Sequence, residues 1–117
     1  MVNNDRCLFC RIAAGEIPAR KVYEDDDVYA FHDINPQAPT HILIIPRKHI
    51  PSLDDIDAGD ASIVGTVVAR AAQLARDLQL TSEGYRLVSN TGAAAGQTVF
   101  HIHFHLLGGR NFGWPPG

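Results

Sequence analysis

The sequence lacks the features that mark several large classes of protein. Its longest apolar run, Ile42 to Ile45, is far too short to cross a membrane, which takes about 20 apolar residues in a helix. Ten Lys and Arg stand against 13 Asp and Glu, for a net charge of -3, so binding to nucleic acid is not expected. Asp5 and Arg6 stand where a signal peptide needs apolar residues, so we expect a cytoplasmic location.

What remains is the composition of an ordinary globular chain. The 117 residues are 45% hydrophobic and 20% charged, and they contain no repeat, linker or low-complexity segment. A chain of this length has room for one hydrophobic core. We therefore expect a single domain over residues 1–117, in which residues 108–117 form a turn-rich C-terminal tail.

The hydrophobic pattern predicts an α+β fold. A short helix is expected within Cys7–Gly15, closed by a left-handed glycine, and a long amphipathic helix over Ala61–Leu78, capped by Asp60 or a neighbouring aspartate. Five strands are expected, the third buried on both faces and the last the longest: Lys21–Glu24, Val28–His32, His41–Ile45, Tyr85–Ser89 and Val99–Leu107. These elements indicate a five-stranded antiparallel meander sheet whose second face is available for a ligand.

Three of the six histidines fall within five residues, at His101, His103 and His105. Side chains alternate along a strand, so the three imidazoles are expected on one side and the apolar residues between them on the other. A rise of about 3.3 Å per residue places the roots of neighbouring imidazoles about 6 to 7 Å apart. One phosphoryl-sized group can therefore contact two of them.

Three interpretations of this histidine run stay open. The histidines are polar residues on a solvent-facing strand, or metal ligands, or the machinery of phosphoryl or nucleotidyl transfer, in which one imidazole attacks phosphorus. The loop from Gly92 to Gly96, immediately before the run, favours the third interpretation because the N–H groups of a glycine-rich turn can bind phosphate oxygens.

The same residues carry a resemblance to a known family. The run HIHFHLL fits the pattern His-φ-His-φ-His-φ-φ, with φ apolar, of the histidine-triad (HIT) family, and the ending GQTVFHIHFHLLGGRNFGWPPG resembles its Hint branch, the purine nucleoside phosphoramidases. The segment CLFCRIAAGEIPARKVYEDDDVYAFHDINPQAPTHILIIPRKHI is similar to the N-terminal half of the family. The stretch between Pro51 and Thr81 is the exception, because it resembles the family only in containing a generic helix.

The resemblance implies an activity and a catalytic set. It implies hydrolysis of purine nucleoside 5′-phosphoramidates, with AMP-like or GMP-like heads, through a covalent intermediate on His103 and without a metal cofactor. His105 is then expected to contact the phosphate, and His101 and His41 to belong to a proton-sharing network around it. A neutral imidazole suits this role because it is both a nucleophile and a leaving group near neutral pH.

The resemblance also implies a nucleotide site. Asp33 matches the position that binds ribose hydroxyls, with Phe31 and Ile34 near the base. The positions that match those holding the α-phosphate and the leaving group are Asn90, Gly96, Gln97 and Thr98. Thr98 stands where serine is common in the branch and is included in the expected catalytic set for its hydroxyl.

Cys7 and Cys10 form a CxxC pair in a chain without a secretion signal, which argues against a structural disulfide. Metal binding, redox chemistry and burial in the core stay open. In relatives that share the pair, histidines matching His49 and His101 complete a structural zinc site. If zinc binds here, His101 is a ligand and does not act as a free acid or base.

The C-terminal tail is expected to pack against protein, either within its own subunit or at a partner. The Trp114–Gly117 segment, WPPG, is too apolar for a freely solvated end and packs either on its own subunit or near the site of a partner. The resemblance implies a homodimer, a purine nucleotide substrate and no nucleic-acid or membrane partner. Two alternative functions remain: a dinucleoside polyphosphate hydrolase of the same superfamily, and a nucleotide-binding or partner-binding module without catalysis.

Overall fold

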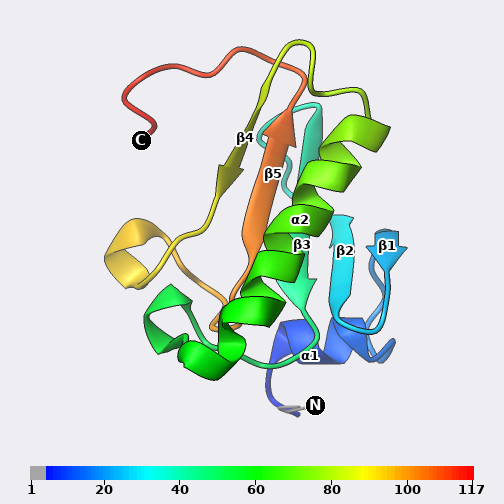
Figure 1. Ribbon diagram of the computed structural model, residues 1–117, viewed down its shortest axis with the longest axis vertical. Helices are drawn as coiled ribbons and strands as arrows, with labels where there is room; N and C mark the ends of the chain where they lie inside the picture. The colour runs from blue at the N-terminus through cyan, green and yellow to red at the C-terminus, as the bar shows by residue number, and fades with distance from the viewer. Residues whose placement is uncertain (1–4) are drawn as a thin grey trace.

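The computed structural model describes residues 5–117 and has one five-stranded antiparallel sheet (Figure 1). The strands run in the spatial order β1-β2-β3-β5-β4. Their bounds are β1 Lys21–Glu24, β2 Val28–His32, β3 Thr40–Pro46, β4 Tyr85–Val88 and β5 Phe104–Gly108. The two α-helices are α1 Leu8–Ala13 and α2 Ala61–Asp77, and three short 3-10 turns lie in the connections.

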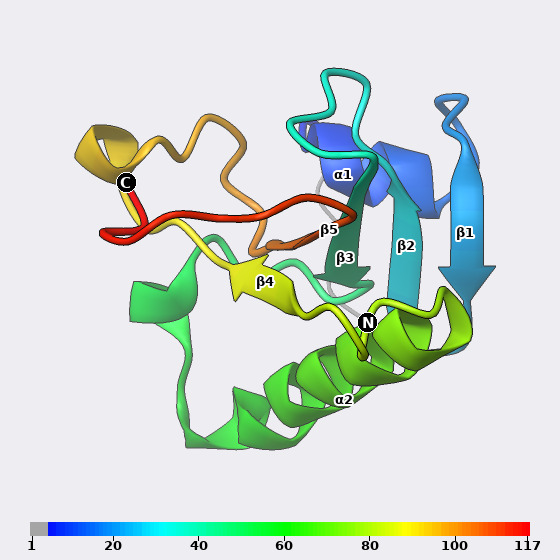
Figure 2. The same ribbon diagram turned by 90° about the horizontal axis from the view of Figure 1, so that it is seen from above.

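The helices lie on opposite faces of the sheet (Figure 2). Along β3, Ile42 and Ile44 face the core beneath α2, and Leu43 and Ile45 face the core beneath α1. This alternation buries β3 on both faces, as its uninterrupted apolar sequence predicts. Because α1 is short, it leaves part of its face of the sheet for polar side chains.

The fold class and both helices predicted from the sequence are confirmed. The strands Lys21–Glu24 and Val28–His32 have the predicted bounds. Gly15, just beyond α1, has the predicted left-handed backbone with φ +80°. At the start of α2 the capping carboxylate belongs to Asp57, which accepts from the N–H of Asp60 in the 3-10 turn before the helix.

The strand order departs from the simple meander that the sequence predicts. The chain leaves β3, crosses one face of the sheet as α2 and returns at the outer edge as β4, so that β5 lies between β3 and β4. The central position suits β5, because Leu106 is fully buried beneath α2.

The last strand is also shorter than predicted, beginning at Phe104 instead of Val99. The register pairs Ile44 with Phe104, so a longer β5 would bring Ile102 opposite Pro46. Pro46 has no N–H to donate, and its carbonyl accepts a hydrogen bond from the imidazole of His101. The sheet ladder therefore stops, and the N–H of Ile102 donates to the carbonyl of Ile50 instead.

The C-terminal tail turns away from the sheet at Gly109 and runs past β4. The ring of Phe112 has the guanidinium groups of Arg86 and Arg110 at 5.1 and 4.3 Å from its centroid. Trp114 is 84% exposed. Within residues 5–117, no helix has the length and apolar character needed to span a membrane.

Candidate active site

The histidines that the sequence places in one run divide between two neighbouring groups. The rings of His103 and His105 lie 5.1 Å apart, and that of His41, from β3, lies 5.2 Å from His105. His101 instead lies with Cys7, Cys10 and His49. The ring of Phe9 contacts both His101 and His103, so the two groups share one wall.

The hydrogen bonds of His103 fix which of its nitrogens carries the proton. Its Nδ1 lies 2.8 Å from the carbonyl oxygen of His101, and a carbonyl can only accept, so Nδ1 carries the hydrogen. In the neutral ring the lone pair is then on Nε2. The hydroxyl of Ser89 donates to the main-chain carbonyl of His103 at 2.9 Å and holds this residue in place.

His41 and His105 form a second hydrogen-bonded unit. The N–H of Gln37 donates to Nδ1 of His41 at 3.0 Å, so the proton of the neutral ring is on Nε2. That Nε2 lies 2.9 Å from Nδ1 of His105 and 3.4 Å from a carboxylate oxygen of Asp33. His105 accepts at Nδ1, which leaves its Nε2–H as a donor.

Burial keeps these imidazoles neutral. Desolvation lowers the pKa of His103 below its ordinary value, and the hydrogen bond to the carbonyl of His101 opposes this effect only in part. Desolvation, with the neighbouring His103 and His41, lowers the pKa of His105 to about 4. Burial also lowers the pKa of His41, although the negative charge of Asp33 acts to raise it. At neutral pH the group thus offers an imidazole lone pair beside an imidazole N–H donor.

The residues expected near the base and ribose lie at the end of β2. Asp33 accepts the N–H of Asn35 with one carboxylate oxygen, at 2.8 Å, and faces His41 with the other. Ile34 is fully exposed. Phe31 is only 5% exposed and packs edge-on against Phe9, so it belongs to the wall beneath α1.

The residues expected near the phosphate come from the segment that follows β4. Asn90 is half-buried there, and Gly96 has a left-handed backbone with φ +96°. The carboxamide of Gln97 is buried and bonded within the protein, because it accepts the N–H of Gly92 and donates to the carbonyls of Pro51 and Val99. Gln97 therefore holds the loop, and its side chain is not directed into open space.

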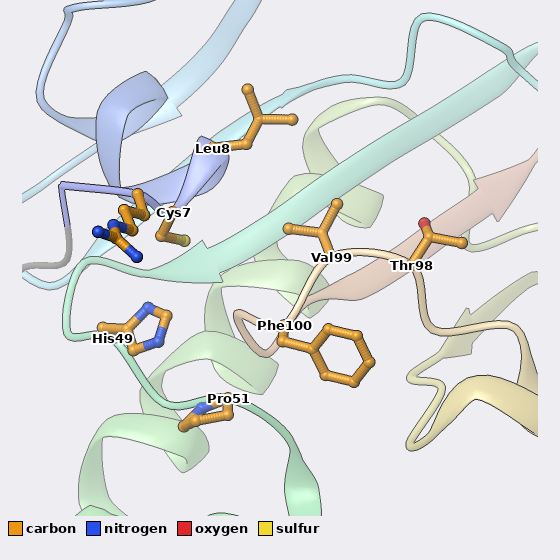
Figure 3. Close-up of a pocket in the computed structure, with 8 residues that line it drawn as sticks. Cys7, Leu8, His49, Pro51, Thr98, Val99 and Phe100 are labelled. Carbon is orange, nitrogen blue, oxygen red and sulfur yellow. The ribbon is translucent and has the colours of Figure 1, made fainter.

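Thr98 is exposed and lines a cavity of about 530 Å³ (Figure 3). Val99 and Phe100 lie beside Thr98 in the lining, and Cys7 and His49 lie across from them. The other lining residues are Arg6, Leu8 and Pro51, so His41, His103 and His105 are not part of this lining. The cavity adjoins the cysteine–histidine group.

Cys7, Cys10, His49 and His101 have the spacing of a tetrahedral metal site. The two Nδ1 atoms lie 3.2 Å apart, and three nitrogen–sulfur distances are 3.3, 3.4 and 3.5 Å. A zinc tetrahedron has edges of about 3.4 Å between nitrogens and about 3.6 Å between nitrogen and sulfur. His101 is oriented for this role, because its Nε2–H donates to the carbonyl of Pro46 and its Nδ1 lone pair faces the thiols. These four residues fit a zinc ion.

Asp33, His41 and His105 also place ligand atoms within 4.8 Å of one another. The short distance between the His41 and His105 nitrogens is accounted for by the proton they share. This second set therefore forms a hydrogen-bonded unit.

Several positioning residues carry no signal in the sequence. Ser89, Gln37 and Pro46 each hold a histidine through one hydrogen bond, and in two of the three the bonding group is a main-chain atom. Main-chain contacts depend on the register and on loop paths, not on residue type. Phe9 was expected only as an apolar residue of the short helix, but it forms the shared wall of both histidine groups.

Comparisons with known proteins identify the family. The HIT domain family matches residues 14–112. The purine nucleoside phosphoramidase of Escherichia coli K12 is 48% identical over 109 residues, covering 93% of this chain and 92% of the relative. An uncharacterized HIT-like protein of Synechocystis is 50% identical over 110 residues, covering 94% of this chain and 96% of the relative.

Solved structures agree with this match. The crystal structure of a HIT family hydrolase from Legionella pneumophila has a TM-score of 0.94 and 54% identity, covering 96% of this chain and all of the relative. A histidine triad protein from Clostridium difficile has a TM-score of 0.92 and 43% identity, covering 96% of this chain and 97% of the relative. The chain belongs to the HIT domain family.

Proposed function

We propose that this HIT-family enzyme hydrolyses purine nucleoside 5′-phosphoramidates, breaking the P–N bond through a covalent nucleotidyl intermediate on His103. The observation that carries the proposal is the Nδ1–H bond of His103 to the carbonyl of His101, which leaves the Nε2 lone pair for attack on phosphorus. The name of the Escherichia coli relative, at 48% identity, supports the substrate class.

The reaction proceeds in two displacements. In the first, Nε2 of His103 forms a bond to phosphorus, the P–N bond of the substrate breaks, and the leaving nitrogen takes up a proton from solvent and departs as an amine. In the second, water attacks phosphorus and the bond to His103 breaks, which releases the nucleoside monophosphate and a proton. His105 donates its Nε2–H to a phosphate oxygen in both steps, and His41 holds His105 in the required tautomer.

The remaining residues bind the nucleotide. Asp33 binds the ribose hydroxyls through its carboxylate, and the exposed side chain of Ile34 contacts the base, with Phe31 behind it. The loop after β4 surrounds the phosphate and the leaving group. In this proposal Gln97 shapes that loop from within, and the positions that face the ligand are Asn90, Gly96 and Thr98.

The test is steady-state hydrolysis of a fluorogenic adenosine 5′-phosphoramidate by the wild type and by His103→Ala. We expect turnover to be abolished in the variant and AMP binding, measured by calorimetry, to be largely retained. His32→Ala is the matched control, because His32 lies on β2 outside both histidine groups. Acid-quenched wild type should carry a nucleotidyl adduct in its mass spectrum, and near-full activity of His103→Ala would refute the assignment.

A diadenosine polyphosphate in the same assay tests the alternative hydrolase. Faster turnover of that compound than of the phosphoramidate would place the chain with the dinucleoside polyphosphate hydrolases. If neither compound turned over while AMP still bound, the chain would be a nucleotide-binding module without catalysis.

We also propose that Cys7, Cys10, His49 and His101 hold a structural zinc ion. When bound, zinc cross-links the start of α1 to the segments at residues 49 and 101, and neither displacement uses it. The fit of the four donors to tetrahedral edges supports this proposal. Native mass spectrometry with reduced thiols is the test, and a metal-free spectrum of the protein purified with zinc available would reject it.

A homodimer in the cytoplasm is the proposed setting. β4 is an outer strand with one edge unpaired within the described chain, and Val68 on α2 and Leu78 just after it are exposed, so an edge and apolar side chains are available to a second copy. Cys7 and Cys10 are thiols that are not joined in a disulfide, which suits a reducing compartment. Size-exclusion chromatography with light scattering tests the dimer, and a monomer at micromolar concentration would contradict it.

A further inference from the structure

The tail is linked to the histidine group through hydrogen bonds on either side of the main chain of Gln37. The Nε–H of Arg110 donates to the main-chain carbonyl of Gln37 at 2.8 Å. The N–H of the same Gln37 donates to Nδ1 of His41 at 3.0 Å, and Nε2 of His41 lies 2.9 Å from Nδ1 of His105. Arg110 is therefore two residues removed from His105, although it lies on the exposed surface.

The contact at Gln37, together with the Asp33 carboxylate 3.4 Å from Nε2 of His41, sets the direction of the proton along these hydrogen bonds. Because Gln37 donates to Nδ1 of His41, the proton of His41 is on Nε2, and His105 accepts it at Nδ1. If the Gln37 N–H turned away, His41 would be free to carry its proton on Nδ1. The His41 Nε2 would then accept, His105 would carry its proton on Nδ1, and His105 would present a lone pair where a donor to phosphate is required.

The tail holds Arg110 in position at Gln37. The guanidinium group lies 4.3 Å from the centroid of the Phe112 ring, and its NH1 donates to the carbonyl of Asn111 at 3.0 Å. One residue earlier, Gly109 has φ +90°, and a Cβ there would lie 2.9 Å from Cβ of Pro39. The start of the tail thus packs closely on the loop that presents Gln37.

We infer that Arg110 is a positioning residue, which holds the main chain of Gln37 through its carbonyl so that the Gln37 N–H stays on His41 and His41 keeps the tautomer that makes His105 a donor. The catalytic consequence rests on the proposed function, and the structural link from Arg110 to His41 does not. Arg110 itself touches no reacting atom. Its effect therefore falls on the transition state through His105 and not on the binding of the nucleoside.

The test compares the wild type with Arg110→Ala and Arg86→Ala. Both variants remove a guanidinium group from the Phe112 ring, and Arg86 also donates to the carbonyl of Gly113, but only Arg110 bonds to Gln37. Arg86→Ala thus controls for loosening of the tail. The readouts are amide hydrogen exchange at Gln37 and the ¹⁵N shifts of the His41 imidazole, with thermal melting to verify that each variant is folded.

In Arg110→Ala we expect exchange at Gln37 to be about tenfold faster, the factor that corresponds to one net hydrogen bond. The Nδ1 shift of His41 should move away from that of a hydrogen-bonded acceptor. For the phosphoramidate, kcat should fall by a similar factor while KM changes little. Arg86→Ala should leave the Gln37 exchange and the His41 shifts unchanged.

Unchanged exchange at Gln37 and unchanged His41 nitrogens in Arg110→Ala would overturn the inference, as would equal changes in Arg86→Ala. The two NMR readouts do not require turnover. A wild type without phosphoramidase activity would therefore reject the proposed function, while the NMR comparison would still decide whether Arg110 positions His41.

Discussion

Zinc binding should stabilise the protein by an amount that depends on each of the four donors. Free zinc at 100 times its dissociation constant adds about 2.7 kcal/mol to the free energy of unfolding when it binds only the folded state. In a domain of this size 1 kcal/mol raises Tm by about 4 °C, so the expected shift is about 11 °C. The donors already lie at nearly tetrahedral separations, so little of the binding energy is spent on rearrangement.

Thermal melting in zinc-buffered solution, with a thiol reductant present, measures this shift. Cys10→Ser removes one donor that lies 3.4 Å from His49 and 3.5 Å from His101, and the zinc-dependent shift should fall below about 3 °C. Leu8→Ala is the control, because Leu8 lies on the same helix with 44% exposure and offers no ligand atom. The reasoning would be refuted if zinc did not change the Tm of the wild type, or if it raised the Tm of Cys10→Ser as far as that of the wild type.

Three further predictions concern the hairpin, the loop and the tail. Burial alone would raise the pKa of Asp25, but bonds from Tyr23, Arg70 and two main-chain N–H groups hold the pKa well below its usual range. Its ionised form therefore adds stability above the unfolded pKa of about 4, and this contribution is lost as pH falls toward the folded pKa. Asp25→Asn should lower the free energy of unfolding by about 1 to 2 kcal/mol at pH 7 and by less at pH 3, in urea titrations; equal losses at both pH values would contradict this. Gly109→Ala should cost about 1 to 3 kcal/mol in the same titration, because of the φ of +90° and the close contact with Pro39, and a stability equal to that of the wild type would count against it. Deletion of residues 111–117 should change the relative kcat/KM values for different leaving amines more than it changes Tm, and an unchanged selectivity profile would argue that the tail serves only its own subunit.

The sequence predicts those parts of the fold in which apolar residues recur at the spacing of one face of a helix or strand. Apolar residues at helical spacing located α2, and the uninterrupted run from Ile42 to Ile45 identified a strand buried on both sides. Strand alternation also predicted that His103 and His105 lie close enough to share one phosphoryl group, and their rings are 5.1 Å apart. Local periodicity carried each of these predictions, because each depends on residues that are near in sequence.

The predictions that failed depend on partners far away in the chain. Nothing near Val99 shows that a longer last strand would meet Pro46, which cannot donate to it. The strand order was missed because the path of α2 across the sheet decides where β5 lies. The tautomers of His41 and His103 are set by main-chain groups of Gln37 and His101, and no pattern of residue types encodes them.

Because β5 begins only at Phe104, the carbonyl of His101 lies outside the sheet ladder, where it accepts a hydrogen bond from Nδ1–H of His103. In a longer strand that carbonyl would be committed to a neighbouring strand, and His103 would lose the acceptor that fixes its tautomer. On the proposed mechanism, extending β5 through residues 99–103 to raise thermal stability is therefore expected to lower turnover. A screen that selected only for heat resistance is then expected to lose the orientation of His103, the proposed nucleophile, and one that selected for activity to retain the short strand.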